Sequence, residues 1–414
     1  MDEESVRLVR STVESMGGNP QATVWGTGHK TSVMMAALAN GTAAHSLDFD
    51  DTNALMIAHP SIQLLPGLFA LAEYEHLSGF DILISYVIGF ETGATLGLAL
   101  NPKHAAQGWL PIGTIGPLMQ AAACSKLLNL GSKKTLMAVG IATNIASGIR
   151  CNNGTMAKPL LAGHAASEGV LAAVLAREGI TANPEALEAR YGYFENFSRG
   201  DPADLERASN VLGERFHIID SGISFKLYPC CAGAHVAIDC ALEIAQRHFP
   251  LPDEIEAISV SIHSGTKVVL IHPRPKTVAQ ARFSLEYSVS RAIIDRQMGL
   301  EQFRQQKIDD PSVQALIEKV KPKYYDASVT ADDLAQSRFP VELEVHMKNG
   351  SIFYSRTEYA KGTPRNPLSS IELEEKFRQC CSAKLSASQI IKALNQLRNF
   401  EQIQDIAGLI PIFT

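Results

Sequence analysis

The densest group of ionisable side chains follows an alanine-rich segment early in the chain. The run from His45 to Thr52 (HSLDFDDT) places three carboxylates within four residues, and His59 follows shortly after it. Such carboxylates are costly to bury unless neighbouring groups neutralise or use them, so we expect a functional site here. Asp50 and Asp51 also belong to a residue type that caps helices and binds loop amides, and we expect that role for at least one polar residue of the run.

Two lysines lie in segments that could add to this site. Lys158 lies in a loop between a glycine and a proline, before a second alanine-rich segment, and Lys226 lies five residues before Cys231 and nine before His235. A lone lysine is usually a solvated surface residue. Next to a buried site, however, it can hold a substrate carboxylate or exchange a proton.

The segment after Lys226 leaves other interpretations open. Cys230, Cys231 and His235 could bind a metal or form a Cys/His nucleophile pair, but adjacent cysteines rarely point at one ion and no local signature supports acyl transfer. We therefore expect no metal site. Tyr287 lies at helical spacing from Phe283, a pattern that by itself favours a core aromatic.

Size and charge limit the classes of protein that fit. The 414 residues, 46% of them hydrophobic, are enough for two domains with large cores. Charged residues make up 19% of the chain, the formal net charge is −6, and Lys and Arg are dispersed, so we expect no nucleic-acid partner. The most apolar stretch, 82–100, contains Glu91 and three glycines, which favours a buried core helix over a membrane span.

Cysteine usage and the N-terminal composition indicate a location. The seven cysteines include no C-x-x-C pair, and the first 15 residues mix acidic and basic side chains without an apolar run. These patterns are typical of a reducing compartment and of a chain without a secretory or transit signal. We therefore expect a cytoplasmic protein.

Periodicity divides the chain into two kinds of structure. Between about residues 30 and 179, small and apolar residues recur at helical spacing. After about residue 217, alternating segments such as 258–262 and 341–347 predict strands, and Asn349-Gly350 predicts a hairpin with a type I′ turn. Helical character returns after residue 363, with Ser369 or Ser370 as the helix cap. The expected fold is mainly α with an α+β insert: a helical domain from residues 1–221 and 364–414, and a smaller lid domain from residues 222–363.

Several motifs spread over nearly the whole chain resemble the MmgE/PrpD family, which includes 2-methylcitrate dehydratases and cis-aconitate decarboxylases. The matching segments are GTG at 26–28, AALANGTAAH at 36–45, the 48–52 run, HPS at 59–61, KPL at 158–160, GHAA at 163–166, 226–235 with AID at 237–239, FSLEY at 283–287 and LEEKF at 373–377. The resemblance implies a helical domain with an α+β lid, a dimer, an active site between the two domains, and no metal or organic cofactor.

The resemblance also implies roles for particular residues. The catalytic candidates are Asp48, His59, Lys158 and Tyr287, and the substrate-binding candidates are Thr52, Lys226, Cys231 and His235. The implied activity is that of a lyase acting on a small di- or tricarboxylic acid by removing a proton next to a carboxylate, through dehydration or aconitate-type decarboxylation. Lysines would stabilise the developing charge, and a closed lid would exclude water.

Departures from the family pattern keep alternatives open. Leu110 and Leu161 stand where many members of the family carry histidine. Cys231 also stands where the decarboxylase-like members carry a histidine. These losses argue against a mechanism identical to that of the cis-aconitate decarboxylases and leave dehydration, isomerisation or epimerisation open. The leucines also leave open an inactive member that binds carboxylates. Only 25 residues precede Gly26, whereas the resemblance implies several dozen that include the first helices, so we expect a shortened gene model or a truncated homologue. A rival outside the family, an aspartate-rich isoprenoid synthase, would need a second metal-binding motif, for which Asp309-Asp310 lacks the right followers.

Overall fold

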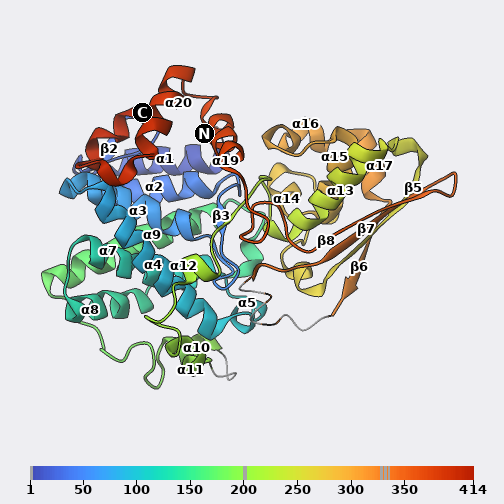
Figure 1. Ribbon diagram of the computed structural model, residues 1–414. Coiled ribbons are helices and arrows are strands. Elements are labelled where there is room, and N and C mark those ends of the chain that lie inside the picture. The colour runs from blue at the N-terminus through green and yellow to red at the C-terminus, as the bar shows by residue number, and fades with distance from the viewer. Residues whose placement is uncertain (1–2, 199–202, 327–329, 331–332, 334–335) are drawn as a thin grey trace.

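The protein consists of a large helical part and a smaller part built around a sheet, which lie side by side in Figure 1. The computed structural model describes residues 3–198, 203–326, 330, 333 and 336–414. Buried apolar side chains between Ala22 and Ala208, joined by those between Ala393 and Ile412, form one core, and those between Tyr228 and Ala360 form a second. The expected fold class, mainly α with an α+β insert, is confirmed.

Long helices pack against one another in the helical part. They are α1 (Glu4–Met16), α2 (Val33–His45), α3 (Pro60–Glu75), α4 (Gly79–Leu100), α7 (Gly116–Leu127), α8 (Ser132–Thr143) and α9 (Ala157–Glu178). Shorter helices and strands connect them: α5 (Lys103–Ala106), α6 (Pro111–Thr114), α10 (Tyr193–Ser198), α11 (Leu205–Ser209), α12 (His217–Asp220), β1 (Ala22–Thr23), β2 (Lys30–Thr31) and β3 (Asp51–Thr52).

Glycines set the closest helix contact, between α2 and α9. A Cβ atom added to Gly41 of α2 would lie 2.7 Å from the Cα of Gly163 in α9, and one added to Gly163 would lie 2.1 Å from the carbonyl oxygen of Leu38. Only residues without side chains let the two backbones approach so closely. This contact holds the C-terminal end of α2, at His45, near the N-terminal end of α9, where Lys158 lies.

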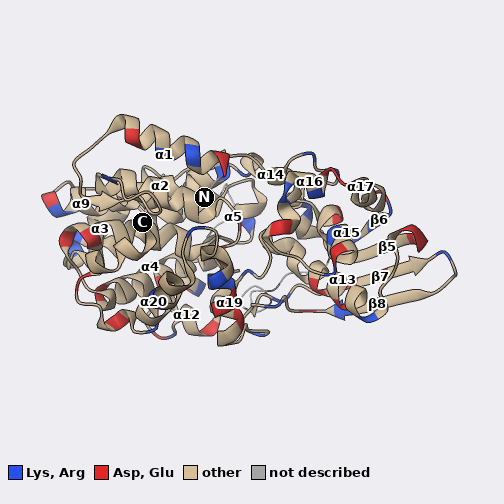
Figure 2. Cartoon of the chain, turned by 90° about the horizontal axis from the view of Figure 1, so that it is seen from above, with Lys and Arg blue, Asp and Glu red and all other residues tan. Residues whose placement is uncertain are grey.

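Helices α4 and α9 are long and apolar enough, by length and composition, to cross a membrane. However, 61% of the most apolar window of each helix is buried within the chain, as in the core helices of soluble proteins. The expectation of a buried core helix at 82–100 is thus consistent with α4. Figure 2 shows Lys and Arg interspersed with Asp and Glu over both parts of the chain.

A four-stranded sheet, in the order β6-β5-β7-β8, forms the second part. Its strands are β5 (Ile255–His263), β6 (Val320–Tyr325), β7 (Val341–Met347) and β8 (Ile352–Thr357), and only the β5–β6 pair is parallel. The helices of this part are α13 (His235–His248), α14 (Val278–Ala281), α15 (Leu285–Asp295), α16 (Gln305–Ile308) and α17 (Pro311–Ile317). Alternate residues of β7 are buried, because successive side chains of a strand point to opposite faces and the helices cover one of them.

The β7–β8 hairpin forms where Asn349-Gly350 predicts it, but the expected type I′ turn is wrong. Of the two residues only Gly350 has a positive φ, of 87°. The amide of Gly350 donates to the carbonyl of Met347, and the amide of Ser351 donates to the side chain of Asn349. This pattern fits a type I turn followed by a glycine in the left-handed region, the usual form of a three-residue hairpin loop.

The chain returns to the helical part through α19 (Ser370–Cys381) and α20 (Ala387–Leu397), drawn in red in Figure 1. Ser369 caps α19, and the side chain of Glu372 accepts a hydrogen bond from the Ser369 amide, as in a capping box. Both ends of the described chain lie over the helical part. Helix α19 lies where the two parts meet, close to the loop that follows α2.

Candidate active site

The close contact between α2 and α9 brings the predicted lysine to the acidic run. The Nζ of Lys158 lies 2.7 Å from Nε2 of His45 and 2.6 Å from Oδ1 of Asp48. Lys226, from the segment that leads into the second part, lies 3.1 Å from the same Asp48 oxygen. Its position follows from the short strand β4 (Ser224–Phe225), which pairs antiparallel with β3.

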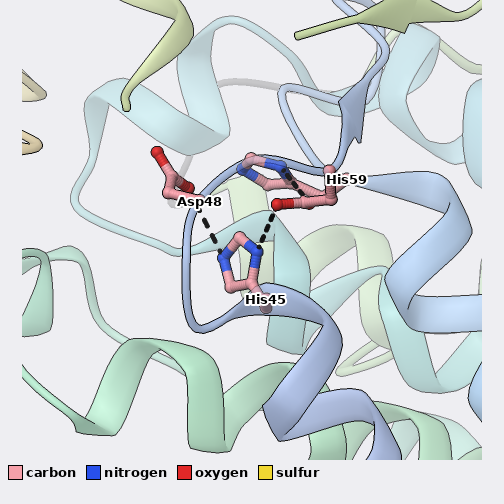
Figure 3. A group of neighbouring side chains, drawn as sticks. His45, Asp48 and His59 are labelled. Carbon is pink, nitrogen blue, oxygen red and sulfur yellow. Dashed lines mark hydrogen bonds and ion pairs between the residues drawn. The ribbon is translucent and has the colours of Figure 1, made fainter. Parts of the chain in front are cut away.

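From His45 the contacts continue through Asp50 to a second imidazole, by one hydrogen bond and one close charge contact. Nδ1 of His45 lies 3.0 Å from Oδ1 of Asp50, and Oδ2 of Asp50 lies 2.7 Å from Nδ1 of His59. Figure 3 shows the ring of His45 between Asp48 and His59. We call Asp48, Lys158, His45, Asp50 and His59 the site network. Its side chains are nearly all buried, and the most exposed, His59, has an exposed fraction of 13%.

Donor and acceptor chemistry fixes the protonation of both rings. An ammonium group has no lone pair, so Nε2 of His45 accepts from Lys158, and its Nδ1 carries the proton that is donated to Asp50. Nδ1 of His59 lies between Oδ2 of Asp50 and the carbonyl oxygen of Asp51, 3.0 Å away, and therefore also carries a proton. The lone pair of His59 is then on Nε2.

Burial and neighbouring charges set the ionisation of the network. Burial lowers the pKa of His59 to about 3 and also lowers that of His45, so both rings are neutral at neutral pH. Burial opposes ionisation of Asp48, but the charges of Lys158 and Lys226 outweigh it and hold the pKa of Asp48 well below its usual range. With Lys226 beside it, the network therefore brings together the fixed carboxylate of Asp48, the cations of Lys158 and Lys226, and the neutral imidazole base of His59.

Three cations hold the loop that carries Asp48. Arg282 donates to the carbonyl of Ser46 at 2.7 Å, Lys226 to that of Asp48 at 3.1 Å, and Lys376 to that of Phe49 at 2.8 Å. Asp48 itself has a φ of 50°, an uncommon conformation for a residue with a side chain. These contacts come from three distant segments of the chain and stabilise that conformation.

Lys376 belongs to α19 and is the least expected of these cations. Its Nζ also donates to the carbonyl of Lys226 at 2.6 Å and lies 4.1 Å from the centre of the Phe49 ring. Burial lowers its pKa to about 8. It connects α19 to the acidic run, at Phe49, and to the segment that carries Lys226.

Asp51 has a structural environment distinct from that of its neighbours. Its carboxylate accepts hydrogen bonds from the amide and the hydroxyl of Ser61, at 3.2 and 2.7 Å. Burial and the charge of Asp50 raise its pKa to about 6. The expectation that one carboxylate of the run binds loop amides fits Asp51.

A cavity of about 520 Å³ opens between the two parts of the chain and is lined by both. Seven of the eight expected site residues line it: Asp48, Thr52, His59, Lys158, Lys226, Cys231 and His235. Burial lowers the pKa of His235 to about 3 and raises that of the Cys231 thiol, so both are neutral at neutral pH. The remaining wall contains apolar residues such as Leu110 and Phe283, and also Arg150.

Tyr287 is the expected site residue that does not line this cavity. It is fully buried on α15 in the second core, and its hydroxyl donates to the carbonyl of Gln302. Burial raises its pKa to about 12. A catalytic role in contact with a ligand of this cavity does not agree with that placement, and the alternative of a core aromatic does. The helical phase of α15 turns Tyr287 towards the sheet's core.

Ligand atoms of four network residues, His45, Asp48, Asp50 and His59, lie within 4.8 Å of one another, as in a metal site. The Lys158 ammonium already donates to two of them, and His45 and Asp50 bond to each other. A metal dication would have to displace that ammonium or lie against it, which is electrostatically unfavourable. We therefore assign these atoms to hydrogen bonding.

Sequence reasoning missed four residues that the structure places at the site. His45 and Asp50 lie within the acidic run, so their proximity to His59 could have indicated them. Lys376 and Arg150 carry no local signal, because they reach the site only through the tertiary fold.

Comparisons with known proteins agree with this architecture. The MmgE/PrpD N-terminal domain matches residues 1–206, and the MmgE/PrpD C-terminal domain matches residues 228–399. The chain is 31% identical to the cis-aconitate decarboxylase of Homo sapiens over 402 residues, which cover 94% of this chain and 82% of that protein. It is 26% identical to the cis-aconitate decarboxylase of Aspergillus terreus, over 94% of this chain and 83% of the relative. It is 24% identical to the 2-methylcitrate dehydratase of Salmonella typhimurium, over 86% and 77%.

Proposed function

The chain belongs to the MmgE/PrpD family, and from this premise we propose that it is a lyase that acts on a small di- or tricarboxylic acid by proton transfer next to a carboxylate. The family membership expected from the motifs is confirmed. The observation that carries the proposal is the site network, in which contacts through His45 and Asp50 join Lys158 to the imidazole of His59, and Lys158 and His59 both line one cavity.

His59 is the proposed base. Its Nδ1 is held by Asp50 and the Asp51 carbonyl, which leaves Nε2 with a lone pair. Taking a proton from a carbon next to a carboxylate turns His59 into an imidazolium, and the carboxylate of Asp50 stabilises that charge. Although its pKa of about 3 makes the free ring a weak base, the negative charge of a bound acid favours the protonated form.

Lys158 and Lys226 are proposed to stabilise the electron pair that the carbon acid keeps. Their positions beside Asp48 place two ammonium groups at the same end of the cavity. In a dehydration, this pair expels hydroxide from the neighbouring carbon, and the hydroxide takes up a proton. In a decarboxylation, the bond to a carboxylate breaks, carbon dioxide leaves, and the carbon takes a proton from the network. Thr52, also in the cavity wall, supplies a hydroxyl donor.

The relatives named above include enzymes of both types, a carboxy-lyase and a hydro-lyase. Leu110 is the observation that favours a second candidate, a member that binds a polycarboxylate without turnover. It is 6% exposed and lines the cavity, and Leu161 packs against it. An apolar wall therefore stands where the resemblance implies imidazoles.

The test is incubation of the protein with cis-aconitate, 2-methylcitrate and citrate in deuterated water, followed by NMR. We expect deuterium at a carbon next to a carboxylate, or a decarboxylated or dehydrated product, with at least one acid. Binding of these acids without exchange or product would contradict the lyase and support the second candidate.

We further propose that the protein is a homodimer, as the family resemblance implies. Large apolar side chains are exposed on and beside α4: Phe80 is 56% exposed, Phe216, the residue before α12, is 52% exposed, and Ile219, within α12, is 77% exposed. Helix α12 packs on α4. Light scattering should give the mass of two chains for the wild type and of one chain for Ile219→Glu, whereas a monomeric wild type would contradict the proposal.

The proposed location is the cytoplasm. All seven cysteines are free thiols in the structure, including the adjacent pairs at 230–231 and 380–381. Free thiols persist in a reducing compartment.

A further inference from the structure

Arg150 is a cation of the cavity wall for which no described residue provides an acidic partner. It lies in the short 3-10 helix η1 (Arg150–Asn152), lines the cavity, and its Nε is buried without a hydrogen-bond partner. Buried polar atoms are nearly always paired, so an unpaired one in a cavity wall requires an explanation. A guanidinium offers five donors in a planar fork that matches a carboxylate.

Each of the other cations of the wall lies next to a carboxylate. Lys158 and Lys226 lie 2.6 and 3.1 Å from the same oxygen of Asp48. Lys361 lies 3.3 Å from an oxygen of Glu372. Arg150 therefore differs from each of them in having no acidic partner among the residues that the structure describes.

The surroundings of Arg150 fix its position and add a second unpaired group. Its amide donates to the carbonyl of Gly108 at 2.9 Å, and the amide of Leu110 donates to that of Gly148 at 3.1 Å, so the two segments hold each other. Asn153, three residues on, also lines the cavity, and its Oδ1 is buried without a partner. Polar groups and the apolar Leu110 thus lie next to each other on one wall.

We infer that Arg150 binds a second carboxylate of the substrate, apart from the one next to which the proton moves, and so selects acids with at least two carboxylates. The inference rests on the proposed function for the identity of the site, but binding alone can test it. Among the charged wall residues, three cations that need a counter-charge (Arg150, Lys158 and Lys226) face the single carboxylate of Asp48. A ligand with two or more negative charges restores the balance, whereas a monocarboxylate leaves one cation unpaired.

The test compares two saturated acids that offer neither a leaving hydroxyl nor a double bond. Calorimetry of the full chain measures the affinity of propane-1,2,3-tricarboxylate and of butyrate for the wild type, Arg150→Gln and Arg150→Lys. We expect Arg150→Gln to weaken tricarboxylate binding about 10- to 100-fold and to leave butyrate binding unchanged. Arg150→Lys, which keeps the charge but not the fork, should lie between the two.

Lys361→Gln is the matched control, because it removes a cation of the same wall whose charge Glu372 already balances. It should leave both affinities unchanged. Circular dichroism and the thermal midpoint check the fold, and Arg150→Met replaces Arg150→Gln if the latter does not fold. Equal affinity of the neutral Arg150 variant and the wild type for the tricarboxylate overturns the inference. So does an equal loss for both acids, or a wild type that binds no tricarboxylate.

These outcomes separate the inference from the proposed lyase. Loss of tricarboxylate binding in Arg150→Gln, together with no turnover of any acid, would support the second-carboxylate site and contradict the lyase. Turnover by the wild type, with unchanged tricarboxylate binding in Arg150→Gln, would support the lyase and contradict the second-carboxylate site.

Discussion

Two clusters of buried charge, one in each part of the chain, serve different ends. The site network reaches the cavity through Asp48, His59 and Lys158, and Lys226 adds a second cation to the same wall. The cluster in the second part surrounds Arg291, which donates to Asp295 at 2.8 Å and to Asp310 at 2.9 Å. Its side chains are absent from the cavity wall.

The comparison of these two clusters shows that buried charge does not by itself indicate function. Arg291 is 1% exposed, as deeply buried as any residue of the network, but its partners Asp295 and Asp310 lie at the end of α15 and at the start of α17, away from the cavity. Asp310 also caps α17, which accounts for the acidic pair that an isoprenoid synthase would need for metal. What distinguishes the site is that its groups line a cavity. Changes to the network should therefore affect turnover, and changes to the Arg291 cluster should affect stability.

The largest effect is expected for Lys158→Met. It removes the ammonium that stabilises the developing charge and fixes the tautomer of His45, so turnover should fall about 10³-fold while the fold persists. Steady-state kinetics with an acid accepted by the wild type measures the change. Lys361→Met is the control that removes a paired cation of the same wall, and turnover by Lys158→Met equal to that of this control would break the distinction between the two clusters.

Arg291→Met should lower the stability of the fold and leave turnover unchanged. It leaves Asp295 and Asp310 without their shared guanidinium, which should lower the free energy of unfolding by about 3–5 kcal/mol. Urea denaturation measures this loss. The turnover number of the remaining folded protein should stay at the wild-type value, and a large fall in it would mean that this cluster also serves the reaction.

Asp51→Asn tests the raised pKa of Asp51, which lies next to the site network, through the pH dependence of the free energy of unfolding. The pKa of Asp51 is about 6 in the fold, above its ordinary value of 3.8, so the unfolded chain ionises first as the pH rises. Stability linked to this group is therefore complete below pH 3.8 and is lost as the pH rises through 6. Relative to Asp51→Asn, the wild type should lose about 2 kcal/mol between pH 4 and pH 6. A difference between the two unfolding free energies that does not vary with pH would contradict the assignment.

The smallest effect is expected for Tyr287→Phe. It removes one buried hydrogen bond to the carbonyl of Gln302 and should cost about 1 kcal/mol of stability. Turnover and its pH profile should not change, because the hydroxyl lies in the second core. A fall in turnover without a change in stability would restore the catalytic role that the family resemblance implies.

Local sequence signals predicted most of the fold. Small residues at helical spacing, strand alternation and the cap at Ser369 each depend on neighbours within a few residues. The turn at Asn349-Gly350 shows the limit of such signals, because loop length and strand register decide between related turn types. The domain boundaries at 222 and 363 stay predictions.

Seven of the eight site candidates line the cavity. They were identified by their match to the family motifs, because their spacing in the sequence does not show that they meet. His45 meets Lys158 across 113 positions of sequence, and Lys376 meets Phe49 across 327. Such contacts depend on helix packing, here on the approach that Gly41 and Gly163 permit. Tyr287 does not line the cavity, because the helical phase within the second core decides which face of α15 is buried.

Deuterium exchange by His59→Gln tests most directly whether His59 is the base. NMR in deuterated water, with an acid that the wild type labels, reports the proton transfer itself, and Tyr287→Phe provides the folded control. The site network predicts that wild type and Tyr287→Phe incorporate deuterium next to a carboxylate and that His59→Gln does not. Incorporation by folded His59→Gln at the wild-type rate would contradict the role of His59 as the base.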